Sequence, residues 1–313
     1  MSQPRVSVMV PCYNARHFLA ECLDSIIAQN RDDMQIVVSD DCSTDGTQDV
    51  LREYEQNHPR LIKAFYNPKN LGITPNCNQA LMACDGEYIS LFAGDDVMLP
   101  GKLDMQVRYM ESHPDVVMTY HAVEIFNSDT DMTLSTTNTS SRLDTSDVTN
   151  IIRKMGIAGP MSIMFRRSSM PKDGYNSSLP VASDWLLQIQ IAVTGKVEKL
   201  PGVWCRYRKH GVNNGKDLNA YKHEFVETLK IVKQLYSDRP DIMAACEAGL
   251  ARFRAGDAFR ELSVSRNAAR ALLREALSHH VRPSYLLAYG ATWIPGIDGI
   301  ARAQKERLKR YLG

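Results

Sequence analysis

The chain has 313 residues, of which 44% are hydrophobic and 23% are charged, and its 37 basic and 36 acidic side chains give a formal net charge of +1. This composition is typical of soluble globular proteins and excludes wholesale disorder. The near-neutral balance argues against nucleic-acid binding, because a duplex-binding protein needs a surplus of cations to displace phosphate counterions.

Targeting signals and cysteine usage favour a cytoplasmic protein. The apolar run 6–10 is too short for the core of a signal peptide, and no uncharged apolar stretch reaches the roughly 20 residues that span a bilayer. The seven cysteines form an odd set without a C-x-x-C pair. Such a set suits a reducing compartment and argues against a disulfide framework or a structural zinc site.

The first hundred residues alternate between strand-type and helix-type periodicity. We expect strands over 6–10, 36–38, 61–66 and 88–92, with helices over 18–27, 50–54 and 77–84 between them. This alternation predicts a doubly wound, mostly parallel α/β sheet. Neither G-x-G-x-x-G nor G-x-x-x-x-G-K-[ST] occurs, so neither a typical dinucleotide-binding enzyme nor a P-loop NTPase is favoured.

Beyond residue 96 the pattern loosens. Residues 116–120 and 161–165 are of strand type and 185–193 of helix type, and the polar stretch 127–146 is expected to be a loop. From about residue 219 the chain is helical. We therefore expect a domain over 1–215 and a helical C-terminal region over 216–313.

Four polar clusters fall at the expected strand ends. In an open parallel sheet the ligand lies beyond the carboxyl ends of the strands. The clusters are Pro11-Cys12-Tyr13-Asn14, the stretch from Ser39 to Thr47, Asn70-Leu71-Gly72 and Gly94-Asp95-Asp96. Each alone is an ordinary turn or helix cap. Their joint occurrence favours one binding site.

The ordered set of clusters resembles the family 2 glycosyltransferases with the GT-A fold. Ser183-Asp184-Trp185 and Tyr207-Arg208-Lys209-His210 complete the resemblance, which covers roughly residues 4–214. It implies a Rossmann-like GT-A catalytic domain. It also implies inverting transfer of a sugar from a UDP- or dTDP-sugar to a hydroxyl of a glycan or a lipid-linked acceptor.

The resemblance identifies Asp95-Asp96 as a D-x-D-type metal motif. Asp96 would coordinate Mn²⁺ or Mg²⁺, and Asp95 would contact the ribose or the waters of the metal. These cations prefer carboxylate oxygens and would neutralise the departing diphosphate. Ala93 stands where the family commonly has a first aspartate, which leaves the number of protein ligands open. His210 resembles the histidine of the family's closing segment, which reaches the metal or the diphosphate.

Further residues would contact the donor by the same resemblance. Either Asp40 or Asp41 would accept a hydrogen bond from the pyrimidine base, and the sequence does not decide between them. The Tyr13 ring would stack on the nucleotide, and Arg208 would pair with phosphate. The expected nucleotide-sugar contacts are Pro11, Tyr13, Asn14, Asp40, Asp41, Asn70, Gly72, Asn78, Asp95 and Arg208.

Asp184 is the expected general base. A carboxylate that takes the proton of an acceptor hydroxyl makes that hydroxyl a competent nucleophile, and a ring such as that of Trp185 would raise its basicity by excluding water. A Ser/Asp cap on the helix 185–193 would equally explain the pattern, and the two roles are compatible. A nucleotidyltransferase and a non-catalytic nucleotide-sugar-binding subunit remain the alternative functions.

The end of the chain is basic and rich in aromatic side chains. Arg270, Arg274, Arg282, Arg302, Lys305, Arg307, Lys309 and Arg310 outnumber Glu275, Asp298 and Glu306, and Tyr285, Tyr289 and Trp293 lie among them. Such a segment is suited to the surface of an anionic membrane. Helix packing against the catalytic domain or in a homo-oligomer would explain it as well.

Overall fold

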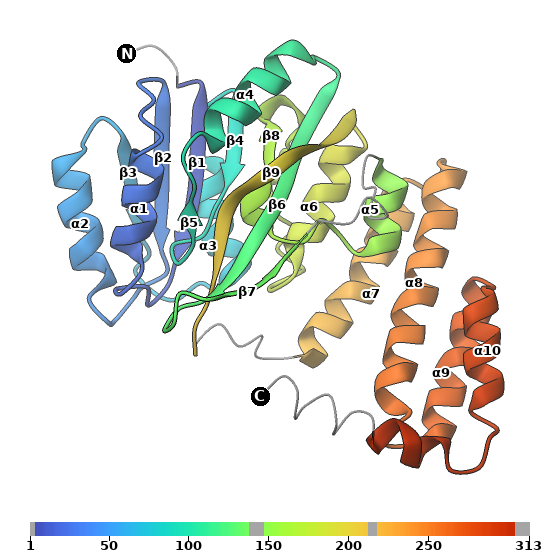
Figure 1. Ribbon diagram of the computed structural model, residues 1–313. Helices are drawn as coiled ribbons and strands as arrows, with labels where there is room; N and C mark the ends of the chain where they lie inside the picture. Colours follow the sequence, from blue (N-terminus) through green and yellow to red (C-terminus); the bar gives the residue numbers. More distant parts are fainter. Residues whose placement is uncertain (1–3, 138–146, 212–217, 304–313) are drawn as a thin grey trace. The chain divides into compact units, whose positions relative to one another are not determined.

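The structure is a computed structural model that describes residues 4–137, 147–211 and 218–303 (Figure 1). The chain forms two compact units, Met1–Thr228 and Leu229–Gly313, which divide inside α7 (Leu218–Leu235). The boundary expected at residue 215 falls in 212–217, outside the described residues. That boundary stays a prediction.

One mixed sheet of nine strands, counted over the described residues, forms the centre of the first unit. Its order is β3-β2-β1-β4-β8-β6-β9-β5, with β7 paired to β6. The pairings make β5, β7 and β8 antiparallel to the remaining strands, so the expected mostly parallel sheet is confirmed. The strands are β1 (Val6–Cys12), β2 (Met34–Asp40), β3 (Ile62–Tyr66), β4 (Tyr88–Leu91), β5 (Val97–Met98), β6 (Val116–Asn127), β7 (Thr133–Thr136), β8 (Met164–Arg166) and β9 (Lys196–Lys209).

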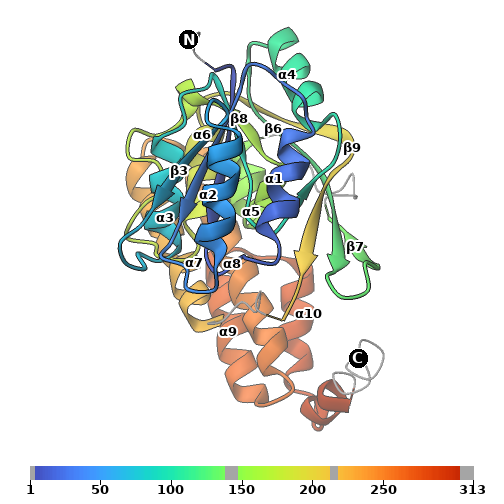
Figure 2. The same cartoon turned by 90° about the vertical axis from the view of Figure 1, so that its left-hand side faces the viewer.

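Helices cover both faces of this sheet (Figure 2). On one face, a core cluster joins Val8 of β1 to Leu23 of α1, Leu51 of α2 and Val107 of α4. On the other face, α3 packs against β1 and β2. The helices of the first unit are α1 (Leu19–Ile27), α2 (Thr47–Asn57), α3 (Ile73–Met82), α4 (Lys102–Ser112), α5 (Val148–Lys154) and α6 (Ser183–Ala192), with the first part of α7.

The sequence-based expectation lacks β5, α4, β7, α5 and β9, and three of these elements show why. Strand β7 lies inside the expected loop 127–146; its side chains are largely exposed, so no apolar pattern marks it. Helix α4 escaped notice because its buried face includes the polar residues Lys102 and Gln106. Strand β9 lacks regular alternation and contains an exposed Pro201-Gly202 pair. In all three, tertiary pairing fixes what the local pattern does not indicate.

The second unit is helical, as expected for the end of the chain. Its helices are the C-terminal part of α7, α8 (Pro240–Glu261), α9 (Arg266–His279) and α10 (Pro283–Ala291). Its small core joins Ala255 and Ala258 of α8 to Ala269 and Leu273 of α9 and to Tyr285 of α10. Within the described ranges, no helix combines the length and the apolar character needed to cross a membrane.

Candidate active site

The first two polar clusters interlock at the carboxyl end of β1. The N–H of Asn14 donates to Ser43 Oγ at 2.8 Å, and Asn14 Oδ1 accepts from the N–H of Thr44 at 3.0 Å. The backbone at Asn14 has a φ of +49°, a left-handed conformation that asparagine tolerates better than most residues. The N–H of Asp41 also donates to the carbonyl of Cys12 at 3.0 Å. The two clusters therefore form one loop assembly.

Asp40 and Asp41 are both buried, but they hold different parts of the site. Asp40 Oδ2 accepts from Gln48 Nε2 at 2.7 Å, so this carboxylate braces its own turn. The oxygens of Asp41 accept from the N–H of Leu71 at 2.7 Å and from that of Gly72 at 2.9 Å. Asp41 thereby ties the second cluster to the third. Which of the two would contact a base stays open.

The third cluster lies beside accessible surface. Asn70 Nδ2 donates to the carbonyl of Asp41 at 3.2 Å. Gly72 has a φ of +89°, which favours glycine, and a Cβ there would meet nothing within 4 Å. Tyr13 is 52% exposed, and Pro11 is partly buried. A planar base therefore has open surface at Tyr13 and Gly72.

Helix α3 anchors the loop that leads to the expected base. Asn78 Nδ2 donates to the carbonyl of Tyr175 and Asn78 Oδ1 accepts from its N–H, both at 2.8 Å. Thr74 Oγ1 donates to the carbonyl of Leu179 at 2.6 Å. The side-chain amide of Asn78 is thus engaged with the main chain of the loop. Donor contact by this residue stays a prediction.

Asp184 lies in the first turn of α6. The helix begins at Ser183 with Ala182 as its N-cap and no side-chain cap, so Asp184 does not cap it. Burial is the main cause that raises the pKa of Asp184; hydrogen bonds from the main chain at Trp185 oppose it, and the charge of Glu224 adds to it. The carboxylate is therefore more basic than an ordinary aspartate.

Trp185 faces the core rather than lying free beside the carboxylate. Its ring stacks on Phe225 with 4.4 Å between centroids, and its Nε1 donates to the carbonyl of Ile151 at 3.2 Å. The residue is 4% exposed. It fixes α6 in place.

Helix α3, which carries Cys77, lies between the segments of Asp41 and Asp184. Burial first, and then the charges of Asp184 and Asp41, raise the pKa of the Cys77 thiol to about 12. Helix α3 joins the two segments directly: Asn76 Nδ2 donates to the carbonyl of Ser39 at 3.1 Å, and Asn78 Nδ2 donates to the carbonyl of Tyr175 at 2.8 Å. The Asp40-Asp41 turn and the loop that leads to Asp184 therefore pack against the same helix.

The Asp95-Asp96 turn lies directly against the first cluster. The N–H of Gly94 donates to the carbonyl of Pro11 at 3.2 Å. A Cβ added to Gly94 would come within 2.7 Å of the Cβ of Cys12, closer than real Cβ atoms approach. Glycine is required there because the two segments pass so closely. The expected metal motif and the expected nucleotide slot are thus neighbours.

Asp96 is fully buried and has one oxygen to spare. Its Oδ1 accepts from the N–H of Arg208 at 3.0 Å, whereas its Oδ2 has no hydrogen-bond partner among the described residues. Burial, followed by the charge of Asp95, raises the pKa of Asp96 well above its ordinary value. His210 Nε2 lies 3.1 Å from Asp95 Oδ2. The structure brings together the three residues expected near the cation.

These residues fit a divalent cation whose remaining ligands come from the substrate and from water. The described part of the chain holds no group of three or more His, Cys, Asp or Glu arranged as a metal site. Mg²⁺ and Mn²⁺ need only one or two carboxylates when phosphates and water supply the other ligands. The spare Oδ2 of Asp96, next to Asp95, meets that requirement.

Arg208 braces the Asp95-Asp96 turn. Its Nε donates to the carbonyl of Asp95 at 2.8 Å, and its guanidinium forms an ion pair with Glu21 of α1. The guanidinium also lies over the rings of Phe18 and Phe126, at 5.1 and 4.8 Å from their centroids. Arg208 is 6% exposed. Its expected contact with phosphate stays a prediction, because the guanidinium already holds the turn.

Sequence reasoning missed two residues that support the site and underrated a third. Glu21 and Glu224 lie on helices without a motif. Asn76, on the helix that follows the third cluster, is not among the expected site residues, yet all of its side-chain polar atoms form hydrogen bonds. Its Oδ1 accepts from Ser39 Oγ and Asn67 Nδ2 at 2.7 and 2.9 Å, and its Nδ2 donates to the carbonyls of Ser39 and Cys12 at 3.1 and 3.4 Å. The available signal for Asn76 was a polar residue on the face of α3 that packs against the sheet.

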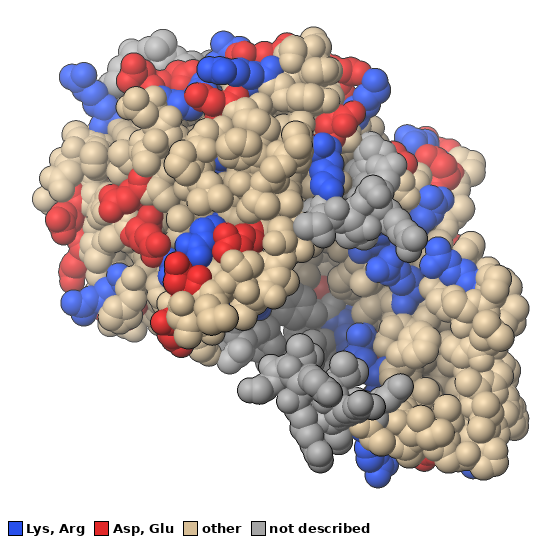
Figure 3. All heavy atoms as spheres, in the orientation of Figure 1, with Lys and Arg blue, Asp and Glu red and all other residues tan. Residues whose placement is uncertain are grey.

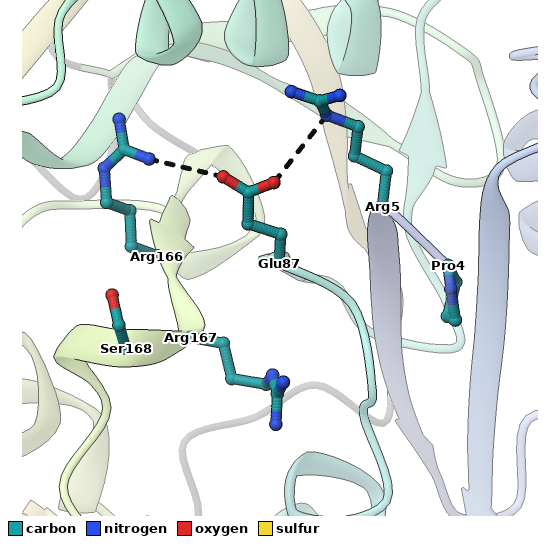
Figure 4. Close-up of a pocket in the computed structure, with 6 residues that line it drawn as sticks. All are labelled: Pro4, Arg5, Glu87, Arg166, Arg167 and Ser168. Atoms are coloured by element: carbon teal, nitrogen blue, oxygen red, sulfur yellow. Dashed lines mark ion pairs between the residues drawn. The ribbon is translucent and has the colours of Figure 1, made fainter. Parts of the chain in front are cut away.

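A separate pocket of about 600 Å³ lies where β1 and β4 begin, away from their carboxyl ends (Figure 4). Its carboxylate, Glu87, lies 3.8 Å from Arg5 and 3.6 Å from Arg166 in two ion pairs. None of the expected site residues lines it. Its lining residues are Pro4, Arg5, Glu87, Arg166, Arg167 and Ser168.

The chain is similar in sequence to bacterial proteins. An uncharacterized protein of Mycobacterium tuberculosis is 28% identical over 225 residues, which cover 71% of this chain and 64% of that protein. The chain thus spans slightly less than two-thirds of this relative's length.

Two solved structures share the fold. Staphylococcus aureus TarS 1-349 in complex with UDP-GlcNAc has a TM-score of 0.66 at 18% identity, covering 96% of this chain and 92% of that one. The mannosyltransferase PcManGT from Pyrobaculum calidifontis, in complex with GDP-Man and Mn²⁺, has a TM-score of 0.57 at 22% identity, covering 97% and 87%. The expected GT-A fold with C-terminal helices is confirmed. Residues 7–172, more than half of the chain, match the model of glycosyl transferase family 2, and the chain belongs to that family.

Proposed function

We propose that this chain transfers a sugar from a nucleoside-diphosphate sugar, such as a UDP- or dTDP-sugar, to a hydroxyl of a glycan or lipid-linked acceptor, with inversion. The observation that carries the proposal is the spare, buried Oδ2 of Asp96 beside the Asp95–His210 pair. A buried carboxylate oxygen without a hydrogen-bond partner destabilises the folded chain unless a cation binds to it. The nucleotide-sugar complexes of the two structural neighbours support the class of donor.

Asp96 would hold Mn²⁺ or Mg²⁺, with Asp95 and His210 next to it. The bound ion would neutralise the charge that develops on the departing diphosphate. Tyr13 would offer its exposed ring to the base, and Gly72 would let the main chain approach the donor closely. These side chains bind and orient the donor.

Asp184 would act as the general base. Its carboxylate takes the proton of the acceptor hydroxyl while that oxygen bonds to the anomeric carbon and the bond to the diphosphate oxygen breaks. The raised pKa of Asp184 suits this task, because a more basic carboxylate draws the proton more effectively. A single in-line displacement of this kind inverts the anomeric centre.

The test is a panel of nucleotide sugars and acceptors with Mn²⁺. We expect one donor to yield a glycosylated acceptor and a nucleoside diphosphate. Asp184→Ala should lower kcat by roughly 10²- to 10⁴-fold while leaving donor affinity unchanged. The exposed Asp173, mutated to Ala, is the matched control and should behave as wild type. Near-normal turnover of the Asp184 variant would remove that residue from the mechanism.

The alternative functions give different products. A nucleotidyltransferase would release pyrophosphate, and a non-catalytic subunit would bind a donor in calorimetry without turnover on any acceptor. Either result would refute the proposed transfer.

We also propose that the second unit contacts an anionic membrane surface. Trp293, Ile294 and Ile300 are more than 50% exposed after α10, and the guanidinium of Arg270 lies 3.6 Å from the centroid of the Trp293 ring. Figure 3 shows this unit as largely uncharged with several Lys and Arg side chains. Aromatic and basic side chains together suit a lipid interface. The basic residues expected beyond position 303 lie outside the described residues.

Vesicle sedimentation tests this contact. We expect binding to vesicles with anionic lipid at low salt and loss of binding in Trp293→Ser. Equal binding to neutral vesicles, or no binding, would refute it. A homo-oligomer through the same face would instead appear in light scattering without lipid, and Trp293→Ser would dissociate it.

A further inference from the structure

A carboxylate from α7 closes the loop that leads into α6. Glu224 Oε2 accepts from the N–H of Val181 at 3.0 Å and from the N–H of Ala182 at 2.6 Å, and Glu224 Oε1 lies 3.2 Å from the same nitrogen of Val181. Glu224 is 4% exposed. Because α6 begins at Ser183 with Ala182 as its N-cap, this distant carboxylate binds the N–H groups of the N-cap residue and of the residue before it.

Those two N–H groups lie just before Asp184 along the chain. Charge-assisted hydrogen bonds to main-chain N–H groups are short and directional, so they fix the path of the backbone. The loop is held from the other side by α3, where Thr74 Oγ1 donates to the carbonyl of Leu179. The first turn of α6 is therefore clamped between α3 and α7.

Glu224 is also the charged neighbour of Asp184. The titratable groups that face Asp184 are Cys77 from α3, Tyr175 from the preceding loop and Glu224 from α7. Burial raises the pKa of the Cys77 thiol to about 12 and that of Tyr175 well above its ordinary value, so both are neutral under assay conditions. Among the described residues, Glu224 is the charged side chain that contributes to the pKa of Asp184.

We infer that Glu224 is a positioning residue for Asp184, acting through the two main-chain N–H groups that it binds and through its negative charge. The inference rests on the proposed role of Asp184 as the base. It makes the first part of α7 a component of the catalytic machinery, although the sequence placed this helix in a separate C-terminal region.

Glu224→Gln and Glu224→Ala separate the two effects. A single oxygen, Oε2, accepts from both N–H groups, so the amide oxygen of Gln can keep both bonds while the charge is lost. We expect Glu224→Gln to retain a kcat within a few-fold of wild type at its plateau and to move the acidic limb of the kcat–pH profile to lower pH. Glu224→Ala should lower kcat roughly tenfold to hundredfold at every pH, because it loses both bonds.

Glu53→Gln is the matched control, since Glu53 is exposed on α2 and does not contribute to the pKa of Asp184. It should leave the profile unchanged. A direct readout is the ¹³C carboxyl titration of Asp184 by NMR, assigned by its absence in Asp184→Asn. We expect the midpoint in Glu224→Gln to lie below that of wild type.

The outcomes are distinguishable. Unchanged titration midpoints in Glu224→Gln would overturn the role of the charge, and wild-type kcat in Glu224→Ala would overturn the role of the hydrogen bonds. If Glu224→Ala does not fold, Glu224→Gln still decides through its kcat–pH profile and its NMR titration. A wild-type chain without transfer activity would refute the proposed function. The NMR titration would still show whether the charge of Glu224 changes the pKa of Asp184.

Discussion

The fully buried Lys102 provides a quantitative test of how the core of the first unit tolerates charge. Its Nζ donates to Ser90 Oγ at 2.7 Å, and no carboxylate of the described residues is among the causes of its pKa shift. Burial lowers that pKa from 10.5 to about 8. We expect Lys102→Met to be more stable than wild type at pH 7, because Met fills a similar volume without a buried ammonium.

The magnitude follows from the pKa shift. A difference of about 2.5 pKa units between the unfolded and folded chain corresponds to about 3 kcal/mol of unfavourable free energy while Lys102 is charged. The Ser90 hydroxyl loses its donor in the variant, which costs about 1 kcal/mol. Lys102→Met should therefore gain about 2 kcal/mol at pH 7. Because the folded pKa is the lower one, the unfolded state binds more protons between pH 8 and 10.5, and wild-type stability from this group rises with pH in that window.

The assay is urea unfolding at pH 7, 8.5 and 10, followed by tryptophan fluorescence; Trp185 and Trp204 belong to the same unit as Lys102. The stability advantage of Lys102→Met over wild type should fall by about 2 to 3 kcal/mol over this range, from about 2 kcal/mol at pH 7 to zero or slightly below it at pH 10. Lys172→Met, at an exposed position, should give a constant difference. A difference that does not change with pH in Lys102→Met would refute the reasoning.

Three further predictions concern the site. Saturating Mn²⁺ should raise the Tm of wild type by several degrees in a thermal shift assay, since ligand at 100 times Kd adds about 2.7 kcal/mol; Asp96→Asn keeps an acceptor for Arg208 but should lose this shift. Glu21→Ala leaves the buried guanidinium of Arg208 without its carboxylate and should weaken Mn²⁺ binding in calorimetry by roughly tenfold; unchanged affinity would contradict the bracing role. Asn76→Ala removes a buried hub of hydrogen bonds and should cost about 2 to 4 kcal/mol in urea unfolding; a loss below 1 kcal/mol would argue against that role.

The sequence predicted that the polar clusters come together, because strand ends in a parallel sheet meet at one edge. Tyr13, Asp41 and Asp96 each follow a strand that periodicity identifies, and the structure brings their segments into contact through the carbonyls of Pro11 and Cys12. No long-range information was needed for that step. Local apolar pattern and topology together were enough.

The roles of individual polar residues were less predictable. Asn78 and Arg208 have side chains that suit a ligand, yet each is engaged with the main chain of a neighbouring loop. A polar side chain that can bind a substrate can equally satisfy a carbonyl or an N–H, and tertiary packing decides between these. Glu21 and Glu224 illustrate the converse, because their partners lie 187 and 42 residues away along the chain. No local pattern carries such a pairing.

The environments of Asp96 and Asp184 divide the proposed chemistry between a buried and a half-buried carboxylate. Burial raises the pKa of both. Asp96 has a spare oxygen beside the acidic neighbour Asp95, an arrangement that a divalent cation would relieve. Asp184 has Glu224 as its charged neighbour, and binding of a proton relieves the repulsion between the two carboxylates. The free-energy cost of a negative charge in a desolvated, acidic environment therefore suits Asp96 to bind a metal ion and Asp184 to accept a proton. Carboxylates in contrasting environments divide the roles of acid and base in other enzymes in the same way.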